Sequence, residues 1–272
     1  MNKQALTIES VQQIQHEMLG ELMAQLPVKD VPVYLLGGTL LGAVREGHQL
    51  GWDDDMDLGL LRQDYNRFID DFVSSDNEVR LMTEFDSDSW VPYARLVYVP
   101  SESESEYYNM NHGIFIDIFP IDAIDTSKFS SRLMFATQKG LNIMRNMARS
   151  TGVLPDEAKL KPVKRLLWPM IKYTNAHTWA LAQANLAKRV SDVNGTQLGV
   201  INGMHGKREF FDRENWEMRQ IAQFENAEVA IIGNVDEYLT QIFGDWHTPI
   251  KQLEKHATFY RVKRAKENGS TK

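Results

Sequence analysis

Four aspartates crowd into five positions of the stretch GGTLLGAVREGHQLGWDDDMDLGL, which spans residues 37–60. They are Asp53, Asp54, Asp55 and Asp57. The rest of the stretch is rich in glycine and apolar residues, and like charges this close favour protonation, solvation or a bound cation. Any fold of this chain must therefore place these carboxylates where something offsets their mutual repulsion.

The residues around the aspartates predict two strands joined through a helix. Residues 31–38 are apolar and β-branched and stop at two glycines, which is typical of a buried strand. TLLGAVRE then predicts a short helix that begins at the glycines. In DMDLGLL, Asp55 and Asp57 alternate with apolar residues, so this segment predicts a strand with one polar and one buried face.

A fifth aspartate, Asp117, lies among apolar neighbours in residues 113–119, which predict a further strand that Pro120 ends. Isolated acids inside apolar strands are rare unless they are paired. If this strand lies beside the one that carries Asp55 and Asp57, the carboxylates converge. Such a set of hard oxygen ligands suits Mg²⁺ or Mn²⁺.

The glycines predict a phosphate site beside this metal. Gly37, Gly38 and Thr39 close a strand and open a helix, where bare backbone N–H groups suit a phosphate. Arg45, on the same predicted helix, would add a positive charge. Arg95, in the predicted strand 93–99, has two interpretations: it contacts phosphate, or it pairs with an acid of the cluster.

The neighbouring acids leave alternatives open. Asp53 and Asp54 are either a solvated turn or metal ligands, and Asp53, in register with the D-x-D pair, is the expected ligand of the two. A calcium-binding EF-hand is excluded, because positions six and twelve counted from Asp53 are Leu58 and Asp64 rather than Gly and Glu. Asp122 is interpreted as a turn residue.

Aromatic residues near two of the predicted strands also have two interpretations. They are ordinary core residues, or they enclose a quaternary ammonium group. The residues concerned are Trp90, Tyr93, Tyr107 and Tyr108.

The remaining chain predicts helices around the strands. Helices are expected at residues 8–26 after an N-cap at Thr7, at 65–72 after an N-cap at Asp64, at 128–150, at 176–190 and at 234–246, with strand and turn at 197–211 and a polar loop at 101–106. This order predicts an α+β or α/β fold, a mixed sheet flanked by helices. We expect one domain, 1–272, with a core at about 28–125, a helical, basic appendage at about 126–215, and a segment at 216–272 that packs back on the core.

Composition narrows the class of protein. There is no cysteine, so disulfides and thiol catalysis are excluded. Neither a signal peptide nor a run of apolar residues long enough to cross a membrane is visible, and we expect a cytoplasmic protein. The net charge of −7 and the absence of a known nucleic-acid-binding motif in the basic tract argue against a nucleic-acid partner.

Charge is unevenly distributed along the chain. Residues 51–125 hold 18 Asp or Glu against 4 Lys or Arg, whereas residues 126–190 hold 12 Lys or Arg against two acids. Within the basic part, residues 159–172 combine lysines with apolar residues and two prolines. This tract predicts either peripheral contact with an anionic membrane surface or a helix pair whose lysines face solvent, and the prolines argue against a continuous amphipathic helix.

Several blocks carry a resemblance to a known family. The ordered set G-G-T, D-x-D and D is similar to the nucleotidyltransferase fold, and residues 37–68 more closely resemble the signature of the LicD family of phosphotransferases. YARLVY, GIFIDIFPIDAI, and FENAEVAIIGNVDEYLTQIFGDW followed by His256 agree with this resemblance.

The resemblance implies transfer of a phospho-alcohol such as phosphocholine from a CDP-activated donor to a hydroxyl of a glycan or lipid-linked glycan, with release of CMP. It implies that Asp55 and Asp57 hold one or two Mg²⁺ ions and that Asp117 completes one metal site. Asp117 then either takes the proton of the acceptor hydroxyl or lowers the pKa of that hydroxyl through the metal. A D-x-D glycosyltransferase and a non-catalytic nucleotide- or metal-binding module remain as alternatives.

Overall fold

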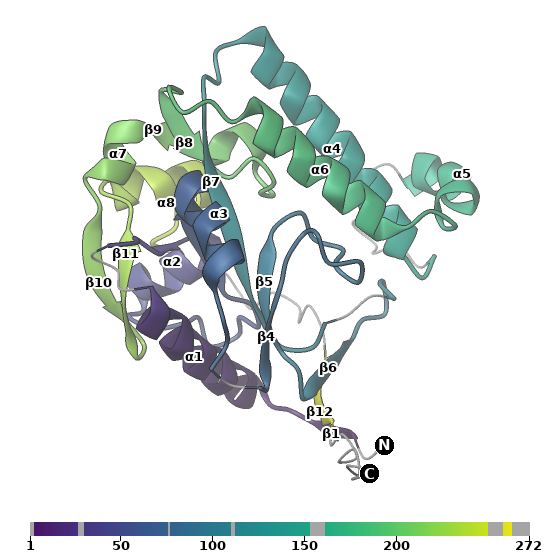
Figure 1. Ribbon diagram of the computed structural model, residues 1–272, viewed down its shortest axis with the longest axis horizontal. Coiled ribbons are helices and arrows are strands. Elements are labelled where there is room, and N and C mark those ends of the chain that lie inside the picture. Colours follow the sequence, from purple (N-terminus) through teal and green to yellow (C-terminus); the bar gives the residue numbers. More distant parts are fainter. Residues whose placement is uncertain are drawn as a thin grey trace.

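The computed structural model describes residues 3–26, 30–75, 77–109, 112–152, 161–249 and 258–262. His256 and Lys159 lie outside these ranges. The described chain is a mixed sheet with helices on both faces and a helical group beyond one end, which confirms the predicted α+β class (Figure 1).

The central sheet has the strand order β10-β11-β2-β3-β7-β5-β4. Its strands are β2 (Tyr34–Leu35), β3 (Asp57–Leu61), β4 (Val79–Met82), β5 (Ala94–Tyr98), β7 (Phe115–Ile124), β10 (Gln220–Phe224) and β11 (Ala227–Ile231). β3 runs parallel to β7 and antiparallel to β2, so the two strands expected to carry aspartates are direct neighbours. β8 (Gln197–Gly199) pairs with the end of β7, and β9 (Phe210–Asp212) pairs with β8.

Helices cover both faces of this sheet. α1 (Ile8–Gln25) and α3 (Arg62–Asp71) lie in front of it in Figure 1, and α2 (Gly37–Arg45) and α8 (Val235–Phe243) lie behind. The front face buries apolar side chains of α1, such as Met18 and Leu22, against strand residues such as Leu58 and Ile118. Thr7 caps α1 by accepting the Ser10 N–H at 3.3 Å, as predicted.

A helical group extends from the sheet after β7. α4 (Phe129–Arg149) packs along α6 (Ala176–Val190), and α5 (Lys161–Ile171) lies at their far end (Figure 1). α7 (Arg213–Glu217) and a short 3-10 helix at Gly206–Glu209 lead back to the sheet. The glycine stop predicted within 234–246 is confirmed at Gly244, which follows the last residue of α8 and has φ +78°.

The predicted end of a strand at Pro120 is wrong, because β7 continues to Ile124. The Asp117 N–H donates toward β3, so by alternation the nitrogen of Pro120 points toward the other edge of β7. On that edge β5 pairs only up to Ile118. Pro120 thus lies beyond the last residue that pairs with β5, and its missing N–H costs no ladder hydrogen bond there.

Three other local predictions are wrong. The expected loop at 101–106 contains β6 (Ser101–Glu104), which joins β12 (Thr258–Val262) and β1 (Lys3–Ala5) in a second sheet, where Lys3 pairs with two glutamates of β6. Asp64 lies inside the first turn of α3 and Leu61 occupies the N-cap position. The prolines do not interrupt the basic tract, because α5 runs through Pro169.

Candidate active site

The sheet brings two of the predicted aspartates side by side. Asp57 on β3 is the register partner of Asp117 on β7, and partners in adjacent strands present their side chains to the same face. The Asp117 N–H donates to the Met56 carbonyl at 2.9 Å, which fixes this register. The face is the one covered by α2. The expectation that three aspartates converge at one place depends on this pairing.

The start of α2 points at the carboxylates. A Cβ added to Gly38 would lie 3.0 Å from Asp53 Oδ2, and one added to Gly37 would lie 3.2 Å from Asp57 Oδ2. Gly37 also has φ +50°, which disfavours any other residue. The glycines therefore allow the helix N-terminus, with its partial positive charge, to approach both acids closely.

Two polar groups hold this arrangement in place. The Thr39 hydroxyl accepts the Asp57 N–H at 2.9 Å, so Thr39 fixes the first residue of β3. The Gly37 N–H donates to the Tyr238 hydroxyl of α8 at 3.1 Å. The predicted glycine turn between strand and helix is thus present, and Gly37 and Thr39 each use one polar group to join it to neighbouring elements.

Burial and repulsion raise the pKa values of the acids. The pKa of Asp53 rises to about 9, first through burial and then through the nearby Asp55. Burial, with Asp55 and Asp117 next in importance, raises the pKa of Asp57 well above its ordinary value. These shifts mean that the folded protein holds charge here at a cost, which a bound cation would remove.

Asp117 has a cationic partner, Arg95. Arg95 Nε donates to Asp117 Oδ1 at 2.5 Å and Arg95 Nη2 donates to Oδ2 at 2.9 Å, inside the protein. The Tyr93 hydroxyl donates to Oδ2 at 3.2 Å. Burial still raises the pKa of Asp117 despite Arg95. Of the two interpretations of Arg95, the structure shows the pairing with an acid.

The donor set fits a hard divalent cation. One carboxylate oxygen from each of Asp53, Asp54 and Asp55 lies within 4.8 Å of the others, the one such group of metal-ligating residues found in the described ranges. Asp57 and Asp117 lie within electrostatic range of Asp55. Several oxygen ligands and no nitrogen or sulfur are what Mg²⁺ and Mn²⁺ prefer.

Arg45 is not brought to the aspartates. It is the last residue of α2, eight positions after Gly37, which corresponds to about 12 Å along a helix. Its guanidinium donates to Glu46 Oε1 at 2.8 Å and to the Trp246 carbonyl at 3.2 Å. Arg45 thus joins the C-terminal end of α2 to Glu46 and to the backbone at Trp246.

Sequence reasoning missed two residues near Asp57. Glu209 is buried and raises the pKa of Asp57 further, and its own pKa is raised to about 7 by burial. Its carboxylate accepts the His205 N–H at 2.7 Å and occupies space that a side chain at Gly203 would fill. Tyr238, which contacts Gly37, is the other. Both follow the motif by over 140 residues, so no local pattern connects them to it.

Two of the four aromatic residues expected to enclose a quaternary ammonium group, Trp90 and Tyr108, instead pack against the side chain of Arg149. The Arg149 guanidinium carbon lies 3.1 Å from the ring centre of Trp90 and 4.3 Å from that of Tyr108. Tyr93 instead packs on Phe119 and bonds to Asp117. In this structure Trp90 and Tyr108 therefore surround an arginine.

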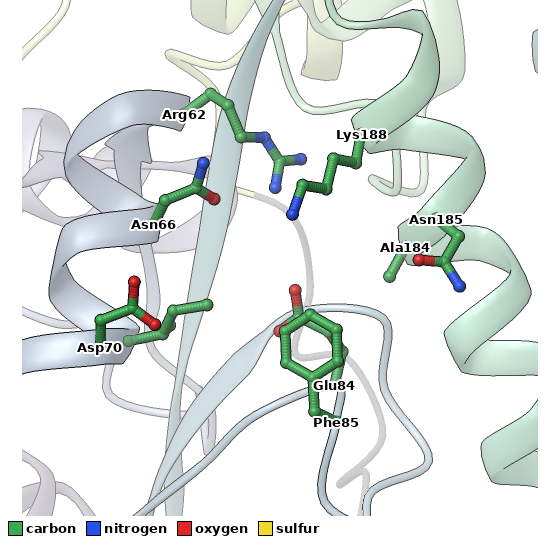
Figure 2. A pocket seen from close by; sticks show the side chains of 9 residues that line it. Arg62, Asn66, Asp70, Glu84, Phe85, Ala184, Asn185 and Lys188 are labelled. Atoms are coloured by element: carbon green, nitrogen blue, oxygen red, sulfur yellow. The ribbon is translucent and has the colours of Figure 1, made fainter.

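A separate cavity of about 370 Å³ lies between α3 and α6 (Figure 2). It is on the opposite face of the sheet, because Asp122, five positions after Asp117, pairs there with Arg62 through two contacts of 2.7 Å. Asp122 is thus a buried strand residue, and its interpretation as a turn residue is wrong. Glu84 in this cavity accepts the Tyr65 hydroxyl at 2.7 Å. The two buried acids on this face, Asp122 and Glu84, have partners, so we do not place the chemistry here.

Within the residues that the structure describes, no helix combines the length and the apolar character needed to cross a bilayer.

Comparison with known proteins shows which family this chain resembles. Residues 30–150 match the family described as LicD/FKTN/FKRP, nucleotidyltransferase domain. The chain is also similar to a "Lipopolysaccharide cholinephosphotransferase LicD" of Haemophilus influenzae, with 21% identity over 220 residues that cover 77% of this chain and 80% of that protein. The predicted resemblance to the LicD family is therefore confirmed, over a segment that holds both the glycine turn and the aspartates.

Proposed function

We propose that this protein is a metal-dependent transferase that moves a phospho-alcohol group, phosphocholine in the first instance, from a CDP-activated donor to a glycan hydroxyl. The observation that carries the proposal is the convergence of buried, repelling carboxylates on a glycine-opened helix N-terminus. The family match and the similarity to a cholinephosphotransferase support the class of reaction. The acceptor would be a cell-surface polysaccharide, a teichoic acid or a lipopolysaccharide.

The roles of the residues follow from their positions. Asp53, Asp55, Asp57 and Asp117 would hold Mg²⁺ or Mn²⁺, which when bound neutralises the donor diphosphate. Gly38 and its helix N-terminus face the same point and suit a phosphate oxygen. Gly37 and Thr39 keep the turn and Asp57 in place through their contacts with Tyr238 and β3.

Transfer of the phospho-alcohol group would be a nucleophilic displacement at phosphorus. The acceptor hydroxyl oxygen forms a bond to the phosphorus that carries the alcohol, and the bond from that phosphorus to the CMP oxygen breaks. Asp117 takes the hydroxyl proton, and CMP leaves with the bonding electrons. Arg95 keeps the Asp117 carboxylate oriented through two hydrogen bonds and stabilises its charged form before the transfer.

The proposal is tested by CMP release with CDP-choline, CDP-ribitol and CDP-glycerol in the presence of Mg²⁺ or Mn²⁺. Asp55→Asn and Asp57→Asn preserve size and remove charge, and each is expected to lower the rate at least about 100-fold. Asp71→Asn, an exposed acid at the end of α3, is the matched control and should leave the rate unchanged.

Activity of Asp57→Asn near the wild-type level would overturn the assignment of the site. Formation of a glycosidic bond from a nucleotide-sugar, with release of a nucleoside diphosphate, would identify a glycosyltransferase instead. Metal-dependent binding of CDP-alcohols without turnover of any of them would identify a non-catalytic module.

A further inference from the structure

Arg145, on α4, has a buried guanidinium that the protein only partly satisfies. Its Nη2 donates to Asn142 Oδ1 at 2.7 Å, one turn earlier in the same helix. Its Nε and Nη1 are buried, and neither has a hydrogen-bond partner within the described residues. An arginine presents five N–H donors in one plane, so most of this group's donors remain available.

Arg145 lies at the Asp117 end of the candidate site. It is within electrostatic range of Asp117, Tyr93, Tyr108 and Arg95. Asp117 is already engaged by Arg95. Across the described ranges, no carboxylate forms an ion pair with Arg145 at 4.0 Å or less.

We propose that Arg145 binds a phosphate group of the nucleotide donor beside the aspartate cluster. This inference rests on the proposed function for the identity of the ligand, and on the orphaned guanidinium for the position. A phosphate at this place would accept hydrogen bonds from Nε and Nη1 together, the two-point contact for which guanidinium and phosphate geometries match.

The energetics favour an anionic ligand over an empty site. A buried cation without a partner is costly, and burial lowers the pKa of Arg145 from its ordinary value. The aspartates repel one another while Arg145, a short distance away, has unsatisfied donors. A phosphate held between a cation on the aspartates and this arginine would satisfy both.

The first test is binding of inorganic pyrophosphate with Mg²⁺, measured by titration calorimetry. Arg145→Gln should weaken binding about 10- to 100-fold, the effect of losing hydrogen bonds to a charged group. Arg145→Lys keeps the charge but loses the two-point geometry, so its affinity for pyrophosphate should lie between those of the wild type and Arg145→Gln. Arg132→Gln removes the same charge from an exposed position of the same helix and should bind like the wild type.

A purely structural role for Arg145 gives different results. In that case Arg145→Gln would unfold at a lower temperature and its folded fraction would bind pyrophosphate with wild-type affinity, which would overturn the proposal. The proposal predicts that Arg145→Gln without ligand is at least as stable as the wild type, and that pyrophosphate raises its melting temperature less.

A measurement on the wild type keeps the test independent of folding of the variants. In the ¹⁵N spectrum of the wild type, the Nε–H signal of Arg145 should shift when Mg²⁺ and pyrophosphate are added. The Nε–H signal of Arg132 should not shift. An Arg145 signal that is the same with and without pyrophosphate would contradict the proposal.

Phosphate on the acceptor glycan is the other source of the same chemistry. If Arg145 serves the donor, Arg145→Gln slows CMP release from CDP-choline in the absence of acceptor. If CMP release is unchanged and only transfer to a phosphorylated glycan falls, the donor assignment is wrong. Wild-type protein that binds pyrophosphate through Arg145 but turns over no CDP-alcohol would contradict the proposed function and leave the arginine site intact.

Discussion

The strand pair β3 and β7 has buried acids on both faces, but their electrostatic surroundings differ. On the α2 face, Asp57 lies beside Asp117 and near Asp53 and Asp55, and burial together with like charge raises the pKa values of Asp53 and Asp57. On the α3 face, Asp122 has no exposed surface and forms a two-point ion pair with Arg62.

This contrast separates function from stability within one sheet. A buried acid that has its own arginine is complete in the folded protein, whereas a group of acids that repel one another is stable only with a further positive charge. Asp117 shares features of both groups: Arg95 pairs with it and lowers its pKa, whereas repulsion from Asp55 raises its pKa. We therefore expect substitutions on the two faces to affect different measurements.

The largest expected effect on stability is on the α3 face. Asp122→Asn leaves the buried Arg62 without its carboxylate and should lower the free energy of unfolding by about 3–5 kcal/mol, measured by urea denaturation. Asp57→Asn removes a repelling charge and should leave the metal-free protein as stable as the wild type or more so. If Asp57→Asn destabilises as much as Asp122→Asn does, the two faces do not differ as described.

Gly38→Ala should mainly affect activity. The added methyl would lie 3.0 Å from Asp53 Oδ2, so the carboxylate must shift by a few tenths of an ångström. We expect CMP release to fall about 10-fold or more, since small displacements at a reacting site are costly. Gly140→Ala, where a methyl meets open space within α4, is the control. Wild-type activity of Gly38→Ala would show that the close approach of α2 is not needed.

The pH dependence of stability should have a defined sign. A carboxyl whose pKa is raised on folding binds protons more tightly in the folded state, so stability falls as pH rises from the unfolded pKa toward the folded one. For Asp53 this window runs from about 4 to about 9. The melting temperature of metal-free protein should therefore fall between pH 5 and pH 8, and Mg²⁺ should raise it more at pH 8. An unchanged or rising melting temperature would contradict this assignment.

The smallest expected effect concerns α5. Leu166, Met170 and Tyr173 are 77%, 75% and 82% exposed, and their spacing places them along one side of the helix and its end. We propose that this side contacts anionic membranes, and replacing Leu166 and Met170 by Ser should reduce co-sedimentation with anionic liposomes severalfold. Leu133→Ser, at an exposed position of α4, is the control. Equal sedimentation of all three proteins would mean that α5 does not face a membrane.

The sequence allowed the local parts of the site to be predicted. Gly37 and Gly38 mark the turn, and the alternation around Asp57 and Asp117 marks two strands that each carry an acid. Their placement on one face depended on the pairing of β3 with β7, which period and composition do not give. Asp55 was predicted to lie on the same strand as Asp57 but precedes it, since β3 begins only at Asp57. The short helix between the strands was predicted for the same reason.

Other parts depended on contacts that no local pattern carries. The strand beyond Pro120 is possible because β5 no longer pairs with β7 at that residue, and β6 forms because Lys3 and β12 approach it. The hairpin of β10 and β11 was not predicted, and its turn uses Glu225 at φ +51° in place of a glycine. Glu209 and Arg145 reach the site only through the fold of the helical group.

The most direct test of the central claim is titration of metal-free protein with Mn²⁺ at pH 7, in two buffers that differ in ionisation enthalpy. Wild-type protein and Asp71→Asn should bind Mn²⁺ and release protons, because Asp53, with a pKa of about 9, must lose its proton to bind the ion. Asp57→Asn should bind far more weakly. Wild-type protein that binds no Mn²⁺, or Asp57→Asn that binds it equally well, would contradict the account.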